Sequence, residues 1–390
     1  MVRIYYLSFF SFNYINFFLL KNNLYLYNMN NYNLKIEDID YNKLLNREPI
    51  IVDNIKTHEY LKNKKILISG GCGSIGSEIV KQLLNLEINN LIVVDNNECG
   101  IFELKNEVSE RFKNNQVKFH LADILDLHRL NHIFNNERPE IIYHCAAYKH
   151  VPIMEDNPWE SIKVNILGTK NIADISIKYN VAKFLMISTD KAVNPTNVMG
   201  ASKRVSEIYI NNLNKYNITE FITTRFGNVL GSSGSVIPTF IKQINKYKKI
   251  DITHKDIIRY FMTIPEAAQL VLYASTIGKR GQILMFDMGE PVRIYDLAQN
   301  IIKNYTNNNI EINIIGLRAG EKLYEELLCN GENTLETDNE HIKISKHNEE
   351  INYDVFLDNY NSLIETYKYL NPIEIKNRLK QLVPEYKISH

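Results

Sequence analysis

From residue 63 onward, short apolar runs alternate with segments that have the apolar spacing of a helix. Residues 65–69 form an apolar run that ends at glycines, which predicts a buried strand, and residues 78–86 have the periodicity of an amphipathic helix. Further strands are predicted at residues 90–95, 117–121, 141–146, 184–188 and 221–225. Because strands alternate with helices, we predict an α/β fold with a Rossmann-like, doubly wound parallel sheet.

The first 28 residues have a different pattern. Residues 4–20 are aromatic and apolar, lie between Arg3 and Lys21, and contain four polar interruptions. A membrane helix needs roughly 20 mainly apolar residues, so this run is marginal, and no small-residue cleavage site follows it. A more ordinary sequence starts at Met29. A disordered or mis-started leader and a peripheral membrane anchor are the two interpretations that stay open.

Composition limits the classes of partner. The 390 residues contain 45 basic and 45 acidic side chains, so no long-range positive field favours nucleic acid, and phosphates must be bound by local geometry. Cys72, Cys99, Cys145 and Cys329 have neither a metal-binding spacing nor a disulfide pattern. We therefore expect a cytoplasmic protein, with peripheral attachment at the inner face of the plasma membrane as the alternative.

A glycine-rich turn joins the first predicted strand to the first predicted helix. Glycine is required where the backbone turns tightly and where a pyrophosphate approaches it, and the helix N-terminus favours the anion. The strand before and the helix after favour a dinucleotide site over an ordinary turn. The predicted cofactor-binding residues of this turn are Gly70, Gly73, Ser74, Ile75 and Gly76.

Two aspartates follow at strand ends. Asp95 lies 19 residues beyond Gly76, where a carboxylate accepts hydrogen bonds from the adenosine ribose and repels a 2′-phosphate, so NAD is predicted over NADP. A strand-ending turn aspartate is the alternative. Asp123 is expected to meet the adenine amino group or, alternatively, to cap a helix.

Residues 188–203 concentrate the candidate chemistry. Thr189, Asp190 and Lys191 stand together at the predicted end of a strand, and Lys203 follows with Met199 four residues before it. On a helix, Met199 and Lys203 share one face.

Six motifs together resemble one known family. They are residues 145–152, 154–158, 165–169, 189–203, 225–231 and 316–327. They are similar to the nucleotide-sugar 4,6-dehydratases of the extended short-chain dehydrogenase/reductase superfamily, in the branch of polysaccharide biosynthesis where methionine replaces the usual tyrosine. The resemblance covers roughly residues 35–330. Membrane-bound members carry transmembrane helices upstream, and weak membrane association through the N-terminus is left open here.

The resemblance implies a substrate and a reaction. The substrate is a nucleotide-linked hexose, taken as UDP-N-acetylglucosamine, although uridine and guanosine are not separated by the sequence. NAD removes hydride from sugar C4, a base takes the C5 proton, an acid protonates the departing C6 hydroxyl, and hydride returns to C6. The product is a 4-keto-6-deoxy sugar, UDP-2-acetamido-2,6-dideoxy-xylo-hexos-4-ulose, with retention at C5 as a hypothesis.

The resemblance also implies residue roles. Asp190 is the candidate acid and Lys191 the candidate base, and burial can neutralise both; an ion pair at a strand end is the alternative. Lys203 binds the nicotinamide ribose, unless it is a surface lysine. Met199 cannot accept the C4 proton, so Thr189, Asp190 or a water takes it.

Further residues are assigned by the resemblance. Asn165 orders a water near Lys203, or is a core or cap asparagine. The other assigned residues are Ala146 and Ala147 at the cofactor, and Lys149, Met199, Asn228, Arg259, Arg318 and Glu321 at the substrate. Plain alternatives exist for several of them: a surface lysine for Lys149, a turn asparagine for Asn228, and a helix-capping pair for Arg318 and Glu321.

The chain is expected to divide into three parts. We expect an N-terminal extension at 1–48, an NAD-binding domain at 49–232 with a return segment near 258–290, and at 233–390 mainly a smaller, discontinuous substrate lobe with C-terminal helices. The histidines show no metal pattern, and relatives suggest a homo-oligomer. The alternatives to a dehydratase are a nucleotide-sugar 4-epimerase and a non-catalytic, nucleotide-sensing Rossmann protein.

Overall fold

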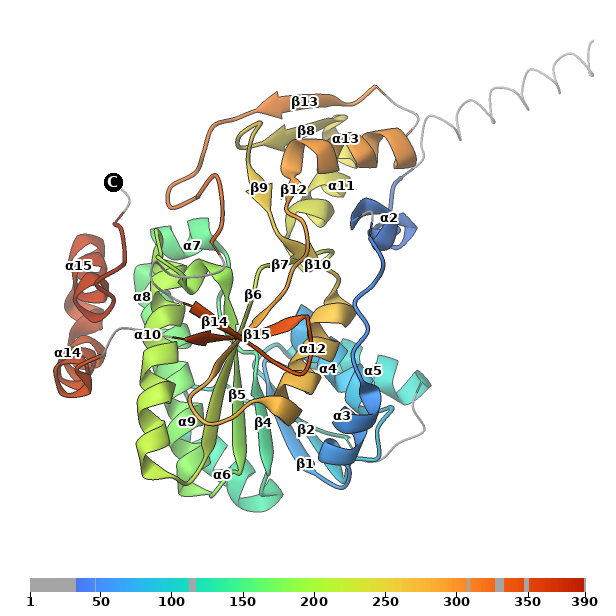
Figure 1. Ribbon diagram of the computed structural model, residues 1–390. Helices are drawn as coiled ribbons and strands as arrows, with labels where there is room; N and C mark the ends of the chain where they lie inside the picture. The colour runs from blue at the N-terminus through green and yellow to red at the C-terminus, as the bar shows by residue number, and fades with distance from the viewer. Residues whose placement is uncertain are drawn as a thin grey trace, which may run out of the picture.

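The computed structural model describes residues 33–45, 47–111, 117–306, 309–326, 333–346 and 351–388. Its largest element is a nine-stranded sheet, in which seven strands pair in parallel and two strands at one edge are antiparallel (Figure 1). In spatial order the strands are β14 (Asn333–Glu336), β15 (Ile342–Lys346), β11 (Ile283–Phe286), β6 (Glu220–Phe226), β5 (Lys183–Thr189), β4 (Ile141–His144), β1 (Lys65–Ser69), β2 (Asn90–Asp95) and β3 (Val117–Leu121). The predicted α/β class with a doubly wound parallel sheet is confirmed.

Helices cover both faces of this sheet, and each face has its own apolar core. Sheets covered on both faces are built from nearly continuous apolar strands, as the buried residues of β1, β2 and β4 are. One face carries α3 (Asn54–Leu61), α4 (Ser74–Leu83), α5 (Glu98–Arg111) and α12 (Ile264–Ile277). The other carries α6 (Leu127–Glu137), α9 (Thr169–Lys178) and α10 (Val198–Leu213), together with α14 (Tyr353–Thr366) and α15 (Pro372–Leu382).

The predicted boundaries differ from the observed ones by a few residues. β4 ends at His144, before the predicted residue 146, because the chain turns there to pass under Gly70. α4 starts at Ser74, earlier than the predicted residue 78, because the glycine-rich turn leads directly into its first turn. β5 and β6 each extend one residue beyond the predicted range at both ends.

A smaller lobe lies above the carboxyl ends of the parallel strands in Figure 1. It has its own apolar core, to which the N-terminal residues Leu34, Ile39 and Leu44 contribute. Its elements are η1 (Ile36–Asp38), α2 (Tyr41–Leu45), β7 (Asn228–Val229), α11 (Val236–Tyr247), β8 (Lys249–Ile252), β9 (Ile258–Arg259), β10 (Phe261–Met262), β12 (Val292–Arg293), α13 (Ile294–Tyr305) and β13 (Glu311–Ile314). The division into domains stays a prediction.

The C-terminal helices pack against the sheet-containing part of the molecule. Phe356 and Tyr360 of α14 and Leu379 of α15 join the core around α10, and the ring of Tyr360 stacks on Tyr209 at 4.6 Å between centroids. Trp159 of α8 (Pro158–Ser161) donates from Nε1 to the carbonyl of Leu370 at 2.8 Å. These helices therefore support the helix that carries Met199 and Lys203.

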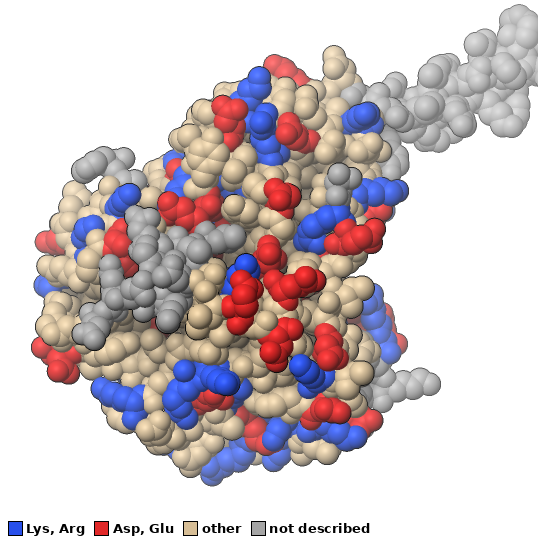
Figure 2. Space-filling model, in the orientation of Figure 1, with Lys and Arg blue, Asp and Glu red and all other residues tan. Residues whose placement is uncertain are grey.

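Acidic and basic side chains both occur on the face seen in Figure 2, with several acidic ones close together near its centre and many basic ones along its lower edge. Within the described ranges, none of the helices combines the length and the apolarity that a membrane crossing needs. The predicted leader or anchor at residues 1–28 lies outside the described residues.

Candidate active site

The glycine-rich turn between β1 and α4 is tight on one side and open on the other. Gly70 has a φ of +70°, and a Cβ there would lie 2.5 Å from the backbone nitrogen of Ala146. A Cβ on Gly76 would lie 2.2 Å from the carbonyl oxygen of Gly70, so both positions require glycine. A Cβ on Gly73 would meet nothing closer than that oxygen, at 3.4 Å. The backbone at Gly73 is therefore open to a ligand.

The N-terminus of α4 is suited to an anion. Gly73 is its N-cap, no side-chain cap is present there among the described residues, and Ser74 and Ile75 form the first turn. Backbone N–H groups at a helix N-terminus have no partner within the helix and attract phosphate. The turn predicted to bind the pyrophosphate of NAD therefore has the open backbone and the free donors that such a group needs.

Asp95 and Asp123 both make local hydrogen bonds at strand ends. The carboxylate of Asp95 accepts from the backbone nitrogens of Cys72 and Asn97, each at 2.9 Å, which fastens the end of β2 beside the glycine-rich turn. Each oxygen of a carboxylate can accept a further hydrogen bond, so this turn role is compatible with binding a ribose. Asp123 accepts from Leu125 at 2.9 Å, and the N-cap of α6 is Asp126, so the capping alternative for Asp123 is wrong.

Met199 and Lys203 lie one turn apart on α10, and both side chains are buried. Burial lowers the pKa of Lys203 to about 8, although the carboxylate of Glu207 opposes this effect. Among the described residues, none accepts a hydrogen bond from Lys203 Nζ. A buried amine without a partner fits the predicted contact with ribose hydroxyls, so the residues of this chain are compatible with NAD.

His144 at the end of β4 joins three elements beneath this site. Its Nδ1 lies 2.7 Å from Ser69 Oγ on β1, and its Nε2 lies 2.9 Å from Thr169 Oγ1 on α9. Burial, reinforced by the charge of Lys203, lowers the pKa of His144 to about 3, so the imidazole is neutral. It acts as a structural link.

Asn165 holds the loop that follows β4. It lies in η2, a π-helical segment (Ile162–Gly168), and is fully buried. Its side chain accepts from the backbone nitrogen of Tyr148 at 2.8 Å and donates to the carbonyl of Tyr148 at 3.0 Å and to Ser202 Oγ at 2.9 Å. These contacts match the alternative of a core asparagine. They also fix the backbone that carries Ala146, Ala147 and the exposed Lys149.

The candidate acid and base form a close pair at the carboxyl end of β5. Asp190 Oδ1 accepts from Lys191 Nζ and from Thr189 Oγ1, each at 2.9 Å. Asp190 is 1% exposed, and its Oδ2 has no hydrogen-bond partner among the described residues. Lys191 Nζ also donates to Asn228 Oδ1 on β7 at 3.2 Å. The structure thus brings together four residues that the sequence analysis selected.

The protonation of Lys191 differs from the expectation that burial would neutralise it. Burial disfavours the charged amine, but the carboxylates of Asp190 and Glu325 outweigh it and raise the pKa of Lys191. Glu325 Oε1 lies 3.7 Å from Lys191 Nζ. The amine is therefore an ammonium in this state.

A buried charge network supports the pair from below. Glu207 of α10 accepts from Arg225 Nη2 at 2.6 Å and Nε at 2.9 Å, from Ser188 Oγ at 2.6 Å and from Arg204 Nη1 at 3.2 Å. Ser188 immediately precedes Thr189, so the network connects α10 to the strand end that carries the candidate chemistry.

The three residues predicted at the substrate nucleotide lie around the segment 315–326. Arg259 uses its guanidinium on backbone carbonyls, donating to Ile258 at 2.7 Å, to Lys322 at 2.7 Å and to Leu323 at 3.2 Å. Arg259 therefore anchors this segment. Its guanidinium already donates to these carbonyls, and its contact with a diphosphate stays a prediction.

The side chain of Glu321 is engaged by neighbouring residues, whereas that of Arg318 is exposed to solvent. Glu321 accepts from Thr253 Oγ1 at 3.1 Å and from the backbone nitrogen of Arg318 at 3.1 Å, and lies 3.6 Å from Arg259. The Arg318 side chain is exposed. The contact between Arg318 and Glu321 lies in a turn, and no helix begins in the described residues 315–326, so the alternative of a helix-capping pair is wrong. Their roles toward a ligand stay a prediction.

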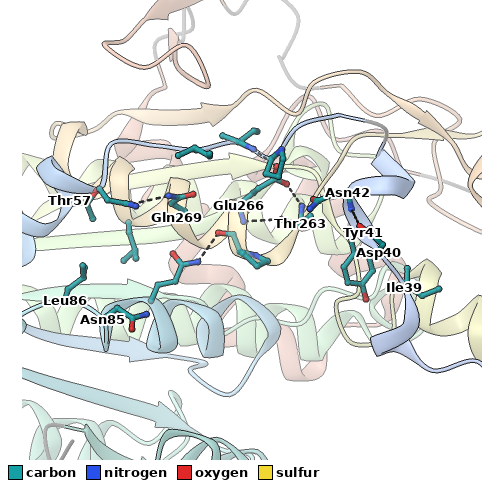
Figure 3. A pocket seen from close by; sticks show the side chains of 17 residues that line it. Ile39, Asp40, Tyr41, Asn42, Thr57, Asn85, Leu86, Thr263, Glu266 and Gln269 are labelled. Atoms are coloured by element: carbon teal, nitrogen blue, oxygen red, sulfur yellow. Dashed lines mark hydrogen bonds between the residues drawn. The ribbon is translucent and has the colours of Figure 1, made fainter. Parts of the chain in front are cut away.

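A cavity of about 780 Å³ lies away from these residues, between the N-terminal segment, the end of α4 and the start of α12 (Figure 3). Glu266 in its wall accepts from the backbone nitrogens of Thr263 and Ile50, each at 2.7 Å, and from Arg47 at 2.6 Å. None of the predicted site residues lines this cavity. We therefore do not assign this cavity to the candidate active site.

Sequence reasoning missed two residues of the site. Glu325 lies within the motif at 316–327, but adjacent Glu326 was equally plausible, and the sequence could not show which carboxylate faces Lys191. Glu207 lies four residues after Lys203, on the same face of α10, and this spacing was an available signal.

The chain is similar in sequence and in fold to known proteins. A family model described as "Polysaccharide biosynthesis protein" matches residues 66–347. The chain is 44% identical over 302 residues to the probable polysaccharide biosynthesis protein EpsC of Bacillus subtilis (strain 168), with 76% of this chain and 50% of EpsC covered. The chain thus spans about half the length of that relative.

Two further matches cover most of the relative's length. A UDP-glucose 4-epimerase of Rickettsia bellii (strain OSU 85-389) is 33% identical, with 82% of this chain and 96% of the epimerase covered. The X-ray structure of Pen from Bacillus thuringiensis matches with a TM-score of 0.69 and 34% identity, over 73% of this chain and 90% of Pen.

Proposed function

Because this chain belongs to the polysaccharide biosynthesis protein family of the extended short-chain dehydrogenase/reductase superfamily, we propose that it is an NAD-dependent nucleotide-sugar 4,6-dehydratase. The proposed substrate is UDP-N-acetylglucosamine, and the proposed product is the 4-keto-6-deoxy sugar with the xylo configuration. Such a product would supply the synthesis of an amino-sugar glycan.

One observation carries the proposal: a buried carboxylate and an amine lie 2.9 Å apart at the carboxyl end of a parallel strand. Active sites of doubly wound sheets lie at this edge. A 4-epimerase needs no such pair, whereas a 4,6-elimination needs one group to take the C5 proton and another to give a proton to the leaving C6 oxygen. Asp190 and Lys191 have the chemistry for both tasks.

The pair can reach its working state without gaining or losing a proton. In the resting state Lys191 is an ammonium beside the carboxylate of Asp190. Transfer of one proton along this 2.9 Å hydrogen bond gives a neutral amine and a neutral acid. Lys191 then takes the C5 proton, and Asp190 gives its proton to the C6 oxygen, which leaves as water. This step restores the ion pair. On return of the hydride to C6, Lys191 gives the proton back to C5, and the pair regains one proton from solvent in place of the one that the C4 hydroxyl releases.

Other side chains hold the reactants. When bound, NAD supplies hydride acceptance at sugar C4 and hydride return at C6. Lys203 would hold the ribose beside the nicotinamide, with the glycine-rich turn at the pyrophosphate. Met199 has no group that accepts a proton, so Thr189, which already donates to Asp190 Oδ1, is the proposed relay for the C4 hydroxyl proton: its oxygen accepts that proton while its own proton passes to water.

Mass spectrometry tests this proposal directly. Purified protein with NAD and UDP-N-acetylglucosamine is expected to convert the sugar nucleotide to a product lacking one water. Asp190→Asn and Lys191→Met are expected to abolish this conversion, and Lys170→Met, which removes the Lys170–Asp174 surface ion pair, is the matched control that retains it. Full turnover by both active-site variants would contradict the proposal.

A 4-epimerase is the second candidate because of the Rickettsia bellii match. It predicts a product of unchanged mass, whereas an unchanged sugar nucleotide would leave a sensing protein or another substrate. Met199 disfavours epimerisation, because methionine stands there in place of the usual tyrosine and has no group that accepts a proton. NMR of the product formed in deuterated water tests whether the configuration at C5 is retained. An inverted C5 would reject the proposed xylo product.

A further inference from the structure

Glu325 lies at the inner side of the segment 315–326 and faces the candidate base. Its side chain is 5% exposed, and its Oε1 lies 3.7 Å from Lys191 Nζ and 3.5 Å from Arg259 Nε. We propose that Glu325 is a positioning residue that acts through Lys191, holding its amine charged and ready to pass a proton to Asp190. This inference rests on the proposed roles of Asp190 and Lys191.

The groups that face Lys191 come from three other parts of the chain. Beside its neighbour Asp190, the amine meets Asn228 of β7 and Glu325 of the segment 315–326, and Arg259 of β9 stands behind Glu325. Asp190 and Asn228 accept hydrogen bonds from Nζ, whereas Glu325 lies beyond hydrogen-bond distance. Glu325 therefore contributes charge to Lys191, while the other two fix the position of its nitrogen.

The four charged groups form a row of alternating sign: Asp190, Lys191, Glu325 and Arg259. This row is neutral as a whole. Proton transfer from Lys191 to Asp190 keeps it neutral, so the transfer needs no proton from solvent. Removing the Glu325 charge takes away one of the two carboxylates that face Lys191, which disfavours the ammonium, while Glu321 still lies 3.6 Å from Arg259. The carboxylate therefore controls when Lys191 gives up its proton.

Glu325 is held in place by the backbone around it. Arg259 donates to the carbonyls of Lys322 and Leu323, and the backbone nitrogen of Ile258 donates to Leu323 at 3.1 Å. Thr196 Oγ1, just before α10, donates to the carbonyl of Gly320 at 3.0 Å. The segment is thus attached both to the smaller lobe and to the helix that carries Lys203, which gives the Glu325 carboxylate a fixed distance from Lys191.

The neighbouring glutamate provides a matched control. Glu326 is exposed and accepts from Asn194 at 2.9 Å and Lys322 at 3.3 Å, with no contact to Lys191. Glu325→Gln and Glu326→Gln are the same chemical change at adjacent positions, one facing the pair and one facing solvent. Thermal unfolding of each variant confirms that it is folded.

The first measurement does not depend on turnover. The full chain is labelled briefly with acetic anhydride between pH 7 and 10, and mass spectrometry of the Lys191 peptide gives the rate, which follows the fraction of neutral amine. An opposite charge within 4–6 Å typically shifts a pKa by one to three units, so Glu325→Gln should accelerate Lys191 labelling roughly 10- to 1000-fold at a given pH. Glu326→Gln should leave the rate unchanged. Equal rates in all three proteins would overturn the inference.

The second measurement uses turnover. The pair needs one shared proton, so kcat/KM should fall at alkaline pH once Lys191 loses it, and this fall should occur at lower pH in Glu325→Gln. If Glu325→Gln instead lowers kcat/KM by the same factor at every pH and the alkaline fall stays at the same pH, Glu325 is only a structural anchor. That result would overturn the inference. If the wild type shows no dehydration, the proposed function fails while the labelling rates still decide the role of Glu325. Glu325→Asp moves the carboxylate one methylene further from Lys191, so Lys191 should be labelled at an intermediate rate in this variant. It replaces Glu325→Gln if that variant is unfolded.

Discussion

The charge of Glu207 should stabilise the fold by about 3 kcal/mol, and replacing it with glutamine tests this. Burial alone would raise the pKa of Glu207, but Arg225, Arg204 and Ser188 outweigh it and lower the value from 4.5 to about 2. A difference of roughly 2.5 pKa units, at about 1.36 kcal/mol per unit, gives about 3 kcal/mol of differential stabilisation. Removing one partner of a buried ion pair typically costs about 3–5 kcal/mol, which agrees. Glu207→Gln keeps the shape and removes the charge, so it should lower the free energy of unfolding by this amount at pH 7.

The pH dependence provides an independent check of this magnitude. Because the pKa of Glu207 is lower in the folded state, its contribution is fully present above pH 4.5 and is lost as the pH falls toward about 2. Wild type should therefore lose stability over this window more steeply than Glu207→Gln. Urea unfolding can be followed by far-UV circular dichroism and by the fluorescence of Trp159, the single tryptophan of the chain.

Glu87 supplies the control for this experiment. It forms an ion pair with Lys62 at 2.6 Å on the surface, where both side chains are largely exposed, so Glu87→Gln should leave the unfolding free energy nearly unchanged. If the free energy of unfolding of Glu207→Gln lies within about 1 kcal/mol of the wild-type value at pH 7, the charge of Glu207 does not stabilise the fold as argued here.

Three further predictions concern the cofactor site and the core beneath it. Gly76→Ala should destabilise the fold because its Cβ would lie 2.2 Å from the Gly70 carbonyl, whereas Gly73→Ala should unfold like wild type but bind NAD more weakly, as thermal melts and calorimetric titration can show. NAD affinity should decline as pH rises through about 8, where Lys203 loses its charge, and an affinity that is the same at pH 7 and 9 would contradict this role. His144 has a pKa of about 3 against an ordinary 6.5, so its contribution to stability is present above pH 6.5 and lost as pH falls, by about 2 kcal/mol at pH 5; His144→Asn should flatten this slope in urea unfolding.

Local patterns predicted the sheet and the nucleotide turn well. The strands at 65–69, 90–95 and 117–121 have the predicted bounds. The first two are apolar runs that are buried on both faces, whereas the third is the edge strand of the sheet and has no buried residue. Gly76 was identified from the spacing of glycines because its steric requirement is local: its Cβ would meet the carbonyl of Gly70. Gly70 has a positive φ, which is also local, but the backbone that its Cβ would meet is that of the distant Ala146. Thr189, Asp190 and Lys191 are adjacent in sequence, so their proximity needed no tertiary information.

Contacts between distant segments could not be predicted in the same way. The partners of Arg259 are carbonyls in the segment 315–326, and the predicted diphosphate role did not anticipate them. The N-terminal residues Leu34 and Ile39 join the core of the smaller lobe, although the extension gave no periodic signal. Each of these contacts depends on how far-apart segments pack, which no local window contains.

The sequence by itself determined the alternation of strands and helices, the glycine-rich turn and the order of the chemical groups after β5, because each depends on neighbours along the chain. Only the tertiary structure decided that Lys191 is charged. Burial lowers its pKa, whereas neighbouring Asp190 and then Glu325, which folding carries to within 3.7 Å of its nitrogen, raise it, and the energy of a buried charge is set by such distances in space.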